Sequence, residues 1–202
     1  GVKGASTNLD RLSKEGIWFT NCYANSYRTD RGTVCTFSGY QSFPTLSVMK
    51  MPNKSRTLPS IAAELRKQGY HTDFLYGGDI NFTNMKSYLL ESGYQHLTAD
   101  VDFPVSQRKN AWGVNDDITF EWLYNKLKDR KDTPWHTAFL TLSSHEPFEV
   151  PYHKLDEKVP NAFAFTDNCL GQFIERMKKT PLWNDLLVIC LPDHGFYYPE
   201  EG

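Results

Sequence analysis

The 202-residue sequence lacks a long hydrophobic run, an excess of one charge and a cysteine pattern. No apolar stretch approaches the roughly 18 residues of a membrane span, and no signal peptide is visible, so the chain as given is expected to be soluble. A formal charge of −2 without a basic face excludes a typical nucleic-acid-binding protein. The four cysteines show no CxxC or Cys/His zinc spacing and lie in apolar segments, which predicts buried thiols.

The sequence contains enough apolar residues, 40% of the total, for one domain with a substantial core. Apolar periodicity predicts alternating helices and strands, and the predicted strands 135–142 and 186–191 are almost continuously apolar, which is typical of a buried parallel sheet. The fold class is therefore α/β, a three-layer α/β/α arrangement with a mostly parallel central sheet. The expected helices are 8–15, 33–38, 58–68, 84–91, 116–129 and 161–179, and the expected strands are 17–23, 70–76, 135–142 and 186–191.

Polar clusters follow each of the four predicted strands. They contain Thr29, the segment 77–84, His145, and Asp193 with His194. Because the carboxyl ends of parallel strands share one rim of a sheet, and ligands bind there in open α/β folds, we expect these clusters to lie close together.

Thr29 lies where the first predicted strand gives way to a helix, between Arg28 and Arg31. A helix N-terminus offers unpaired N–H groups and the positive end of the helix dipole, so this segment is suited to hold an anion that the Thr29 hydroxyl attacks. The alternative is that Thr29 serves only as a helix N-cap.

Asp193 and His194 are adjacent after an apolar segment, and Gly195 permits a sharp turn. A carboxylate and an imidazole placed in this way can hold one divalent cation; the alternative is a capping Asp and an exposed His. His145 can act as a general acid or position a leaving group, although it can equally be a hydrogen-bonded loop residue. The other four histidines are assigned to structure or solvent.

A metal ion beside Thr29 would stabilise its alkoxide, and the arginines would attract a phosphate or sulfate group. This set of residues suits in-line displacement on phosphorus or sulfur through a covalent Thr29 intermediate. The alternatives are sulfuric ester hydrolysis and a non-catalytic α/β module that binds or senses a ligand.

Several short motifs of this chain resemble those of the alkaline phosphatase and sulfatase superfamily. They occur in the family's order and cover nearly the whole chain. The resemblance is to the branch of lipoteichoic acid synthases, phosphoglycerol transferases and phosphoethanolamine transferases. The matching segments are 7–12 (TNLDRL), Arg28-Thr29, Leu58-Pro59, 77–79 (GGD), 141–148 (TLSSHEPF) and 192–195 (PDHG).

This resemblance implies that Thr29 is the nucleophile and a metal ligand, that Asp193 and His194 are metal ligands, and that His145 faces the substrate. The implied metal is manganese, magnesium or zinc. The arginines Arg28 and Arg31, with Asn84, are expected to bind substrate. The family's first acidic metal ligand ends an opening strand that would precede Gly1, and family members continue past PDHG. Residues 1–202 are therefore expected to form one catalytic domain without its opening strand and C-terminal portion.

The implied substrate is a phospholipid or another phosphate or sulfate ester, and the parent protein is expected to be membrane-anchored on the extracytoplasmic face of a bacterial cell membrane. One departure concerns the head group. Lipoteichoic acid synthases grip glycerol phosphate with a Trp and an Arg, whereas the corresponding loop here reads Phe82-Thr83-Asn84-Met85. A phosphoglycerol donor is not supported by this loop.

Overall fold

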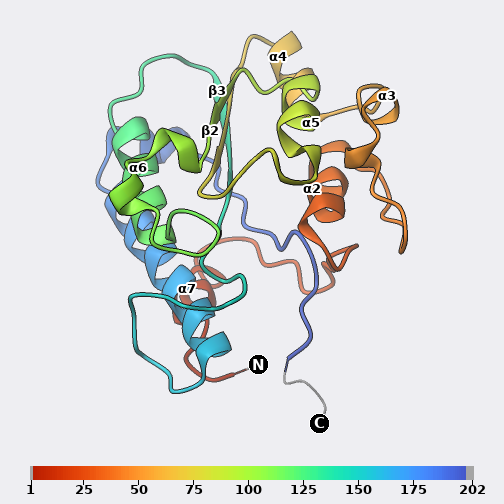
Figure 1. Ribbon diagram of the computed structural model, residues 1–202. Helices are drawn as coiled ribbons and strands as arrows, with labels where there is room; N and C mark the ends of the chain where they lie inside the picture. The colour runs from red at the N-terminus through yellow and green to blue at the C-terminus, as the bar shows by residue number, and fades with distance from the viewer. Residues whose placement is uncertain (1, 199–202) are drawn as a thin grey trace.

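The computed structural model describes residues 2–198 (Figure 1). Its centre is a parallel sheet of β1 (His71–Tyr76), β2 (His96–Thr98) and β3 (Trp135–Leu140), in the order β2-β1-β3. The sequence predicted β1 and β3 to within two residues. The short strand β2 was not predicted, because three residues are too few to show a period.

Helices surround this sheet, and most begin and end near their predicted positions. Two start earlier than expected, α2 by four residues and α7 by three. The helices are α1 (Thr7–Leu12), α2 (Thr29–Ser38), α3 (Pro52–Ser55), α4 (Ile61–Lys67), α5 (Met85–Glu91), α6 (Asp116–Leu127) and α7 (Lys158–Met177). Single 3-10 turns are Val48–Lys50, Phe82–Asn84, Asp100–Asp102, Val105–Gln107 and Pro181–Asp185.

The two faces of the sheet are covered by different helices. Consecutive strand residues point to opposite faces, so Phe74 packs with α2, α4 and α5, whereas Leu75 packs with α6 and α7. Figure 1 shows α6 and α7 on one side of the strands and α2, α4 and α5 on the other. The predicted three-layer α/β/α class is confirmed.

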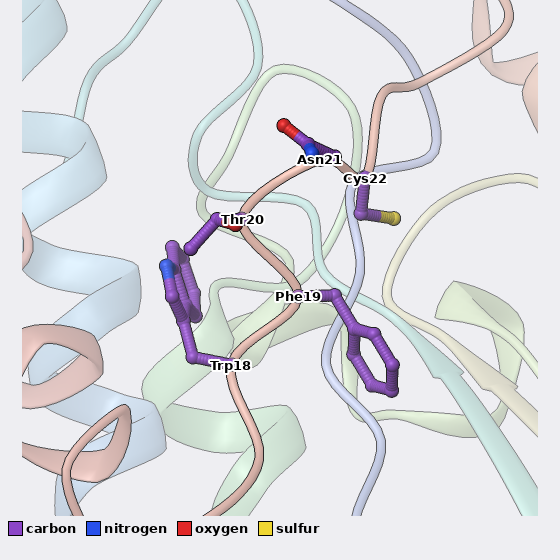
Figure 2. Close-up of a pocket in the computed structure, with 5 residues that line it drawn as sticks. All are labelled: Trp18, Phe19, Thr20, Asn21 and Cys22. Atoms are coloured by element: carbon purple, nitrogen blue, oxygen red, sulfur yellow. The ribbon is translucent and has the colours of Figure 1, made fainter.

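Two predicted strands are wrong. Residues 17–23 and 186–191 pair with no strand in the part of the chain that the structure describes, and residues 20 and 21 form a turn. A strand needs a partner for its ladder of hydrogen bonds, and apolar content alone does not supply one. Their side chains are exposed: Ile17 by 85% and Leu187 by 81%. Figure 2 shows Trp18 to Cys22 along the first segment, where they line an open hollow of about 460 Å³.

The prediction of four buried thiols is also wrong, mainly because two of the cysteines lie in these unpaired segments. Cys22 and Cys190 lie in these two segments and are exposed, Cys35 is half-buried, and only Cys169 is buried. Burial among α6 and α7 raises the pKa of the Cys169 thiol well above its usual range.

The long helix α7 holds α1 through Asp167, a buried carboxylate. Its oxygens accept hydrogen bonds from the backbone N–H groups of Asn8 and Leu9, both at 2.8 Å. These are first-turn amides that an isolated helix leaves unpaired. Asp167 therefore caps α1 although it lies 159 positions after Asn8 in the sequence.

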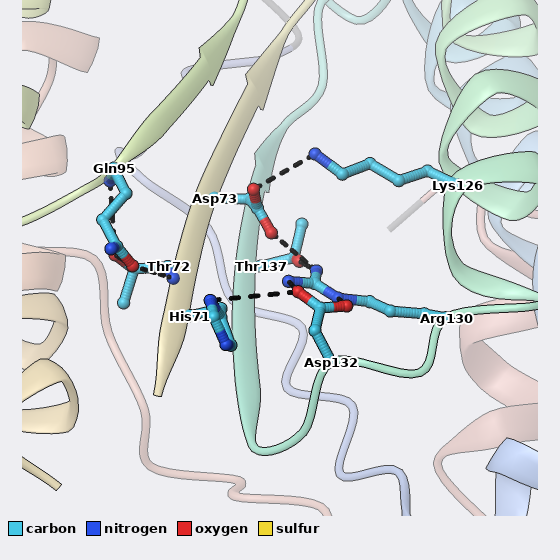
Figure 3. Close-up of polar contacts among 8 residues, drawn as sticks. All are labelled: His71, Thr72, Asp73, Gln95, Lys126, Arg130, Asp132 and Thr137. Atoms are coloured by element: carbon cyan, nitrogen blue, oxygen red, sulfur yellow. Dashed lines mark hydrogen bonds and ion pairs between the residues drawn. The ribbon is translucent and has the colours of Figure 1, made fainter. Parts of the chain in front are cut away.

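A partly buried ion cluster lies between Asp73, in the middle of β1, and the end of α6 with the loop that follows it (Figure 3). The Asp73 carboxylate on β1 is 2.6 Å from the Arg130 guanidinium and 3.1 Å from Lys126 Nζ. Arg130 also contacts Asp132 at 2.8 Å. All of these charges are paired with one another, so the cluster joins the end of α6 to the sheet rather than forming a site.

Candidate active site

Thr29 is the first residue of α2, directly after the extended residue Arg28 (φ −145°, ψ 144°). Arg28, not Thr29, is the N-cap, and its side chain makes no capping hydrogen bond. The capping alternative for Thr29 is therefore wrong. Thr29 is half-buried at the positive end of a ten-residue helix, where an anion is stabilised by the helix dipole.

The segment that carries Asp193 and His194 lies directly against α2. A Cβ atom at Gly32 would overlap the carbonyl oxygen of Asp193, so only glycine allows this approach. The N–H of Gly195 donates to the carbonyl of Ser26 at 2.8 Å. Thr29 and Gly32 are three residues apart, so they share the helix face that meets Asp193. The structure thus brings these two predicted clusters together.

The donor atoms of Asp193 and His194 face each other. His194 Nε2 is 3.8 Å from Asp193 Oδ2, and His194 Nδ1 is 2.8 Å from the carbonyl oxygen of Gly195. A backbone carbonyl at Nδ1 fixes the tautomer that leaves the Nε2 lone pair free, as in metal-binding histidines. Among residues 2–198, no group of three His, Cys, Asp or Glu side chains could hold a metal ion. The Asp193 carboxylate and the His194 imidazole are two donors of the kind that hold a divalent metal ion.

His145 follows β3, as predicted, and its side chain is exposed. Its ring lies edge-on to Trp112, with centroids 5.3 Å apart, and Trp112 in turn lies 6.1 Å from Phe82. The loop before His145 is fixed by Asp116, whose carboxylate accepts from the N–H groups of Leu142 at 2.8 Å and Ser143 at 3.2 Å. Burial raises the pKa of Asp116.

A pocket of about 350 Å³ opens at the end of β1, and we call it the rim pocket; His145 does not line it but contacts Trp112, one of its lining residues. Its wall is the turn at residues 110–113, which packs on the GGD motif: Val114 N–H donates to the carbonyl of Gly77 at 2.8 Å. A Cβ at Gly113, where φ is +145°, would overlap that carbonyl oxygen. The lining residues are Tyr76, Asp79, Phe82, Asp100, Arg108 and 110–113.

Tyr76, the last residue of β1, lines the rim pocket. Burial, together with the charges of Asp193, Asp79 and Asp100, raises the pKa of Tyr76 to about 12. Tyr76 is therefore a neutral hydrogen-bond donor at physiological pH. Asp193 is near enough to Tyr76 for its charge to contribute to this raised pKa.

The predicted substrate-binding residues Arg28, Arg31 and Asn84 differ in their exposure and in their hydrogen-bond contacts. Arg28 is 62% exposed, and Arg31 Nε is buried without a hydrogen-bond partner in the described residues. Both flank Thr29 and remain predicted anion ligands. Asn84 has a structural contact, because its Nδ2 donates to the carbonyl of Met49 at 3.0 Å. It also adopts a left-handed conformation (φ 66°) as the N-cap of α5.

Sequence reasoning missed three residues that line the rim pocket: Tyr76, Asp100 and Trp112. Tyr76 ends a correctly predicted strand, so the strand-end rule could have found it. Asp100 and Trp112 lie in or next to the segment 101–113, which has no period. No local signal indicates that this segment folds back onto Gly77 and Gly78.

A family model described as Sulfatase matches residues 2–201. Among curated proteins, phosphoglycerol transferase I of Salmonella typhi is 23% identical over 207 residues, which cover 92% of this chain and 27% of that protein. The chain thus spans about a quarter of the length of this relative.

Solved structures share the fold. A protein in the alkaline phosphatase superfamily from Vibrio parahaemolyticus aligns with a TM-score of 0.81 and 31% identity, over 90% of this chain and 46% of that one. The lipoteichoic acid synthase LtaP from Listeria monocytogenes aligns with a TM-score of 0.79 and 18% identity, over 90% and 48%. The C-terminal periplasmic domain of EcEptC from Escherichia coli, in complex with Zn, aligns with a TM-score of 0.60 and 15% identity, over 86% and 53%.

Proposed function

Because the chain belongs to the sulfatase family, within the alkaline phosphatase superfamily, we propose that it is the catalytic part of an enzyme that transfers or hydrolyses a phosphate ester. Thr29 is the proposed nucleophile, Asp193 and His194 the metal ligands, and His145 the substrate-side histidine. Residues 1–202 belong to a single catalytic domain in this proposal. The phosphoglycerol transferase relatives support phosphate rather than sulfate as the transferred group.

The contact of Gly32 with Asp193 is the observation that carries this proposal. It places the first turn of α2 against the Asp-His pair, although 164 positions separate Thr29 from Asp193 (193 − 29). The α2 N-terminus and Arg28 would bind the phosphate oxygens and orient phosphorus toward the Thr29 hydroxyl. His145, whose ring contacts Trp112, would donate a proton to the leaving oxygen.

The proposed metal is Mn²⁺, Mg²⁺ or Zn²⁺, and the zinc complex of EcEptC supports this class of ion. When bound, such an ion would lower the pKa of the Thr29 hydroxyl and polarise the phosphate. Asp193 Oδ2, His194 Nε2 and the Thr29 hydroxyl would hold it. The Gly195 carbonyl at His194 Nδ1 would keep the imidazole in the ligating tautomer.

Calorimetric titration of Zn²⁺ and Mn²⁺ into the 202-residue chain tests the metal ligands. We expect one ion per chain, and His194→Ala should weaken binding at least about tenfold because it removes one of the few donors. His153→Ala is the matched control, since His153 is 79% exposed. Equal affinities for the wild type and His194→Ala would refute the assignment.

A phosphodiester such as bis(p-nitrophenyl) phosphate tests the nucleophile in a form of the protein that binds metal. Thr29→Ala should reduce turnover by at least about 10³-fold, because the covalent path is lost. Thr36→Ala, in the same helix, should leave turnover unchanged. Full activity of Thr29→Ala would rule out the covalent mechanism.

A second candidate is sulfuric ester hydrolysis, which the family model favours by its description. Comparing turnover of p-nitrophenyl sulfate with that of the phosphodiester separates the two, and a marked preference for sulfate would reverse the ranking.

The proposed substrate is a lipid-linked ester, and the proposed location is the extracytoplasmic side of a bacterial membrane, on a membrane-anchored parent protein. The likeness to LtaP and to a periplasmic domain supports this location. Within residues 2–198, no helix is long and apolar enough to cross a membrane.

A further inference from the structure

Asp116, the first residue of α6, carries a buried carboxylate that has no cation beside it. Its side chain is fully buried, and it forms no ion pair within residues 2–198. The buried carboxylate of Asp73, in contrast, is paired with Lys126 and Arg130. Burying a carboxylate without a cation costs free energy unless hydrogen bonds hold the charge. The hydrogen bonds of Asp116 are therefore what keeps it in this place.

These hydrogen bonds converge on the turn that carries His145. Asp116 Oδ1 accepts from the N–H of Leu142 at 2.8 Å, and Oδ2 accepts from the N–H of Ser143 at 3.2 Å. The backbone N–H of Asp116 donates in turn to Ser143 Oγ at 2.8 Å. His145 follows at once, and its N–H donates to the carbonyl of Leu142 at 3.0 Å. Three bonds to two adjacent residues fix both the position and the orientation of this turn.

The chain just before Asp116 is bonded to the end of another strand. The N–H of Val114 donates to the carbonyl of Gly77, the first residue of the GGD motif after β1, at 2.8 Å. The strands β1 and β3 are neighbours in the sheet, and the turn with His145 follows β3. The start of α6 therefore joins the loop after β1 to the loop after β3.

A third donor to Asp116 comes from α7. Thr166 Oγ1 donates to Asp116 Oδ2 at 2.7 Å. The helices α6 and α7 pack on the same face of the sheet, so this bond ties the turn to the helix layer as well (Figure 1). Asp116 and Ser143 are both fully buried, so neither can touch a substrate. Asp116 can influence a reaction only through the residues that it holds.

We propose that Asp116 is a positioning residue, which sets the place of the His145 ring beside Trp112 and relative to the GGD motif. The ring centroids of His145 and Trp112 are 5.3 Å apart. An asparagine at position 116 would keep one acceptor oxygen and turn an NH₂ group toward a backbone N–H, so the turn would lose one of its bonds. The chemical role of His145 rests on the proposed function, whereas the position of its ring can be measured without turnover.

Nuclear magnetic resonance of the 202-residue chain measures that position. The ring-proton signals of His145, assigned with His145→Ala, depend on the nearby indole of Trp112, because aromatic ring currents shift the signals of neighbouring protons. In Asp116→Asn these signals should move toward those of His153, which is 79% exposed. Ser143→Ala removes only the acceptor for the Asp116 N–H, so it should cause a smaller shift in the same direction, and it tests the same turn if Asp116→Asn does not fold.

Asp167→Asn is the matched control. Asp167 is also a buried carboxylate that accepts from two backbone N–H groups, but these belong to Asn8 and Leu9 in α1. Its neutralisation removes the same kind of interaction at a place that does not hold the His145 turn. The His145 signals should therefore stay unchanged in Asp167→Asn.

Turnover of bis(p-nitrophenyl) phosphate, in a form of the protein that binds metal, shows whether this position matters to the reaction. Asp116→Asn should lower kcat roughly 10- to 100-fold with little change in KM, because a displaced acid is misaligned with the leaving oxygen in the transition state. In a His145→Ala background, the same substitution should lower kcat by less than about twofold, because a positioning residue acts through the group that it holds.

The proposal is overturned if Asp116→Asn and Ser143→Ala both leave the His145 signals in place, or if Asp167→Asn shifts them equally. It is also overturned if Asp116→Asn lowers kcat as much without His145 as with it. Full turnover of His145→Ala would contradict only the proposed role of His145, because the signal shifts in Asp116→Asn do not depend on turnover.

Discussion

At the scale of single residues, Gly32 decides how the candidate site is built. The carbonyl of Asp193 occupies the space that any side chain at position 32 would need. The sequence directed attention to Thr29 and the arginines, whereas the residue that allows the contact is the one without a side chain.

Gly32→Ala should therefore displace Asp193. Alanine favours helix by up to about 1 kcal/mol, but overpacking costs about 1–3 kcal/mol, so we expect net destabilisation and weaker Zn²⁺ binding. Thermal unfolding and calorimetric titration measure the two effects. Gly16→Ala is the control, because its Cβ would lie an ordinary 3.7 Å from the nearest atom. A more stable Gly32→Ala protein with unchanged metal affinity would show that the contact is loose.

At the scale of elements, the spacing of apolar residues is sufficient to predict a helix when the segment carries a complete apolar stripe of its own. The α7 stripe of Phe165, Cys169, Phe173 and Met177 was predicted and is buried. The strands β1 and β3 were predicted from apolar runs of ordinary strand length. The segments 17–23 and 186–191 have equally good runs, yet they are not strands, because strand pairing depends on a neighbour elsewhere in the chain.

The same limit applies to the site. Thr29, His145 and the pair Asp193-His194 could be singled out as site candidates from the sequence, since each follows an apolar segment. The rim pocket could not, because its wall at 110–113 is placed by backbone bonds to the glycines of GGD and has no period of its own.

Asp167 gives a test at this scale. Asp167→Ala should lower the free energy of unfolding by about 2–4 kcal/mol, because it leaves two α1 amides partly buried without partners. Chemical denaturation measures the loss, and hydrogen exchange of Asn8 and Leu9 should speed up selectively. Asp156→Ala, at an exposed carboxylate, should change neither quantity. Unchanged exchange in Asp167→Ala would mean that α1 is held by its apolar contacts alone.

At the scale of the whole molecule, segments 17–23 and 186–191 carry many of the exposed large apolar side chains. A hydrogen bond from Gly195 to Ser26 joins the chain just after each segment, and among the exposed side chains are Ile17, Phe19, Leu187 and Ile189. Contiguous exposed apolar surface of this kind promotes association.

The 202-residue chain should therefore bind 8-anilinonaphthalene-1-sulfonate and self-associate as its concentration rises. The double variant Ile17→Lys, Ile189→Lys should reduce both without changing the free energy of unfolding, because both side chains are exposed, by 85% and 71%. Leu90→Lys is the control, an exposed leucine on the helix α5. Sedimentation velocity measures the association, and a wild-type chain that stays monomeric at all concentrations would contradict this prediction.

The capping of α1 by Asp167 also has a consequence for synthesis on the ribosome. Asn8 is translated 159 residues before Asp167. At about 5–20 residues per second, roughly 8–30 s pass before the carboxylate that completes this helix exists. A six-residue helix is marginal in water on its own, so during that time α1 stays unfolded. Helix α1 therefore folds only after the part of α7 that contains Asp167 has been synthesised.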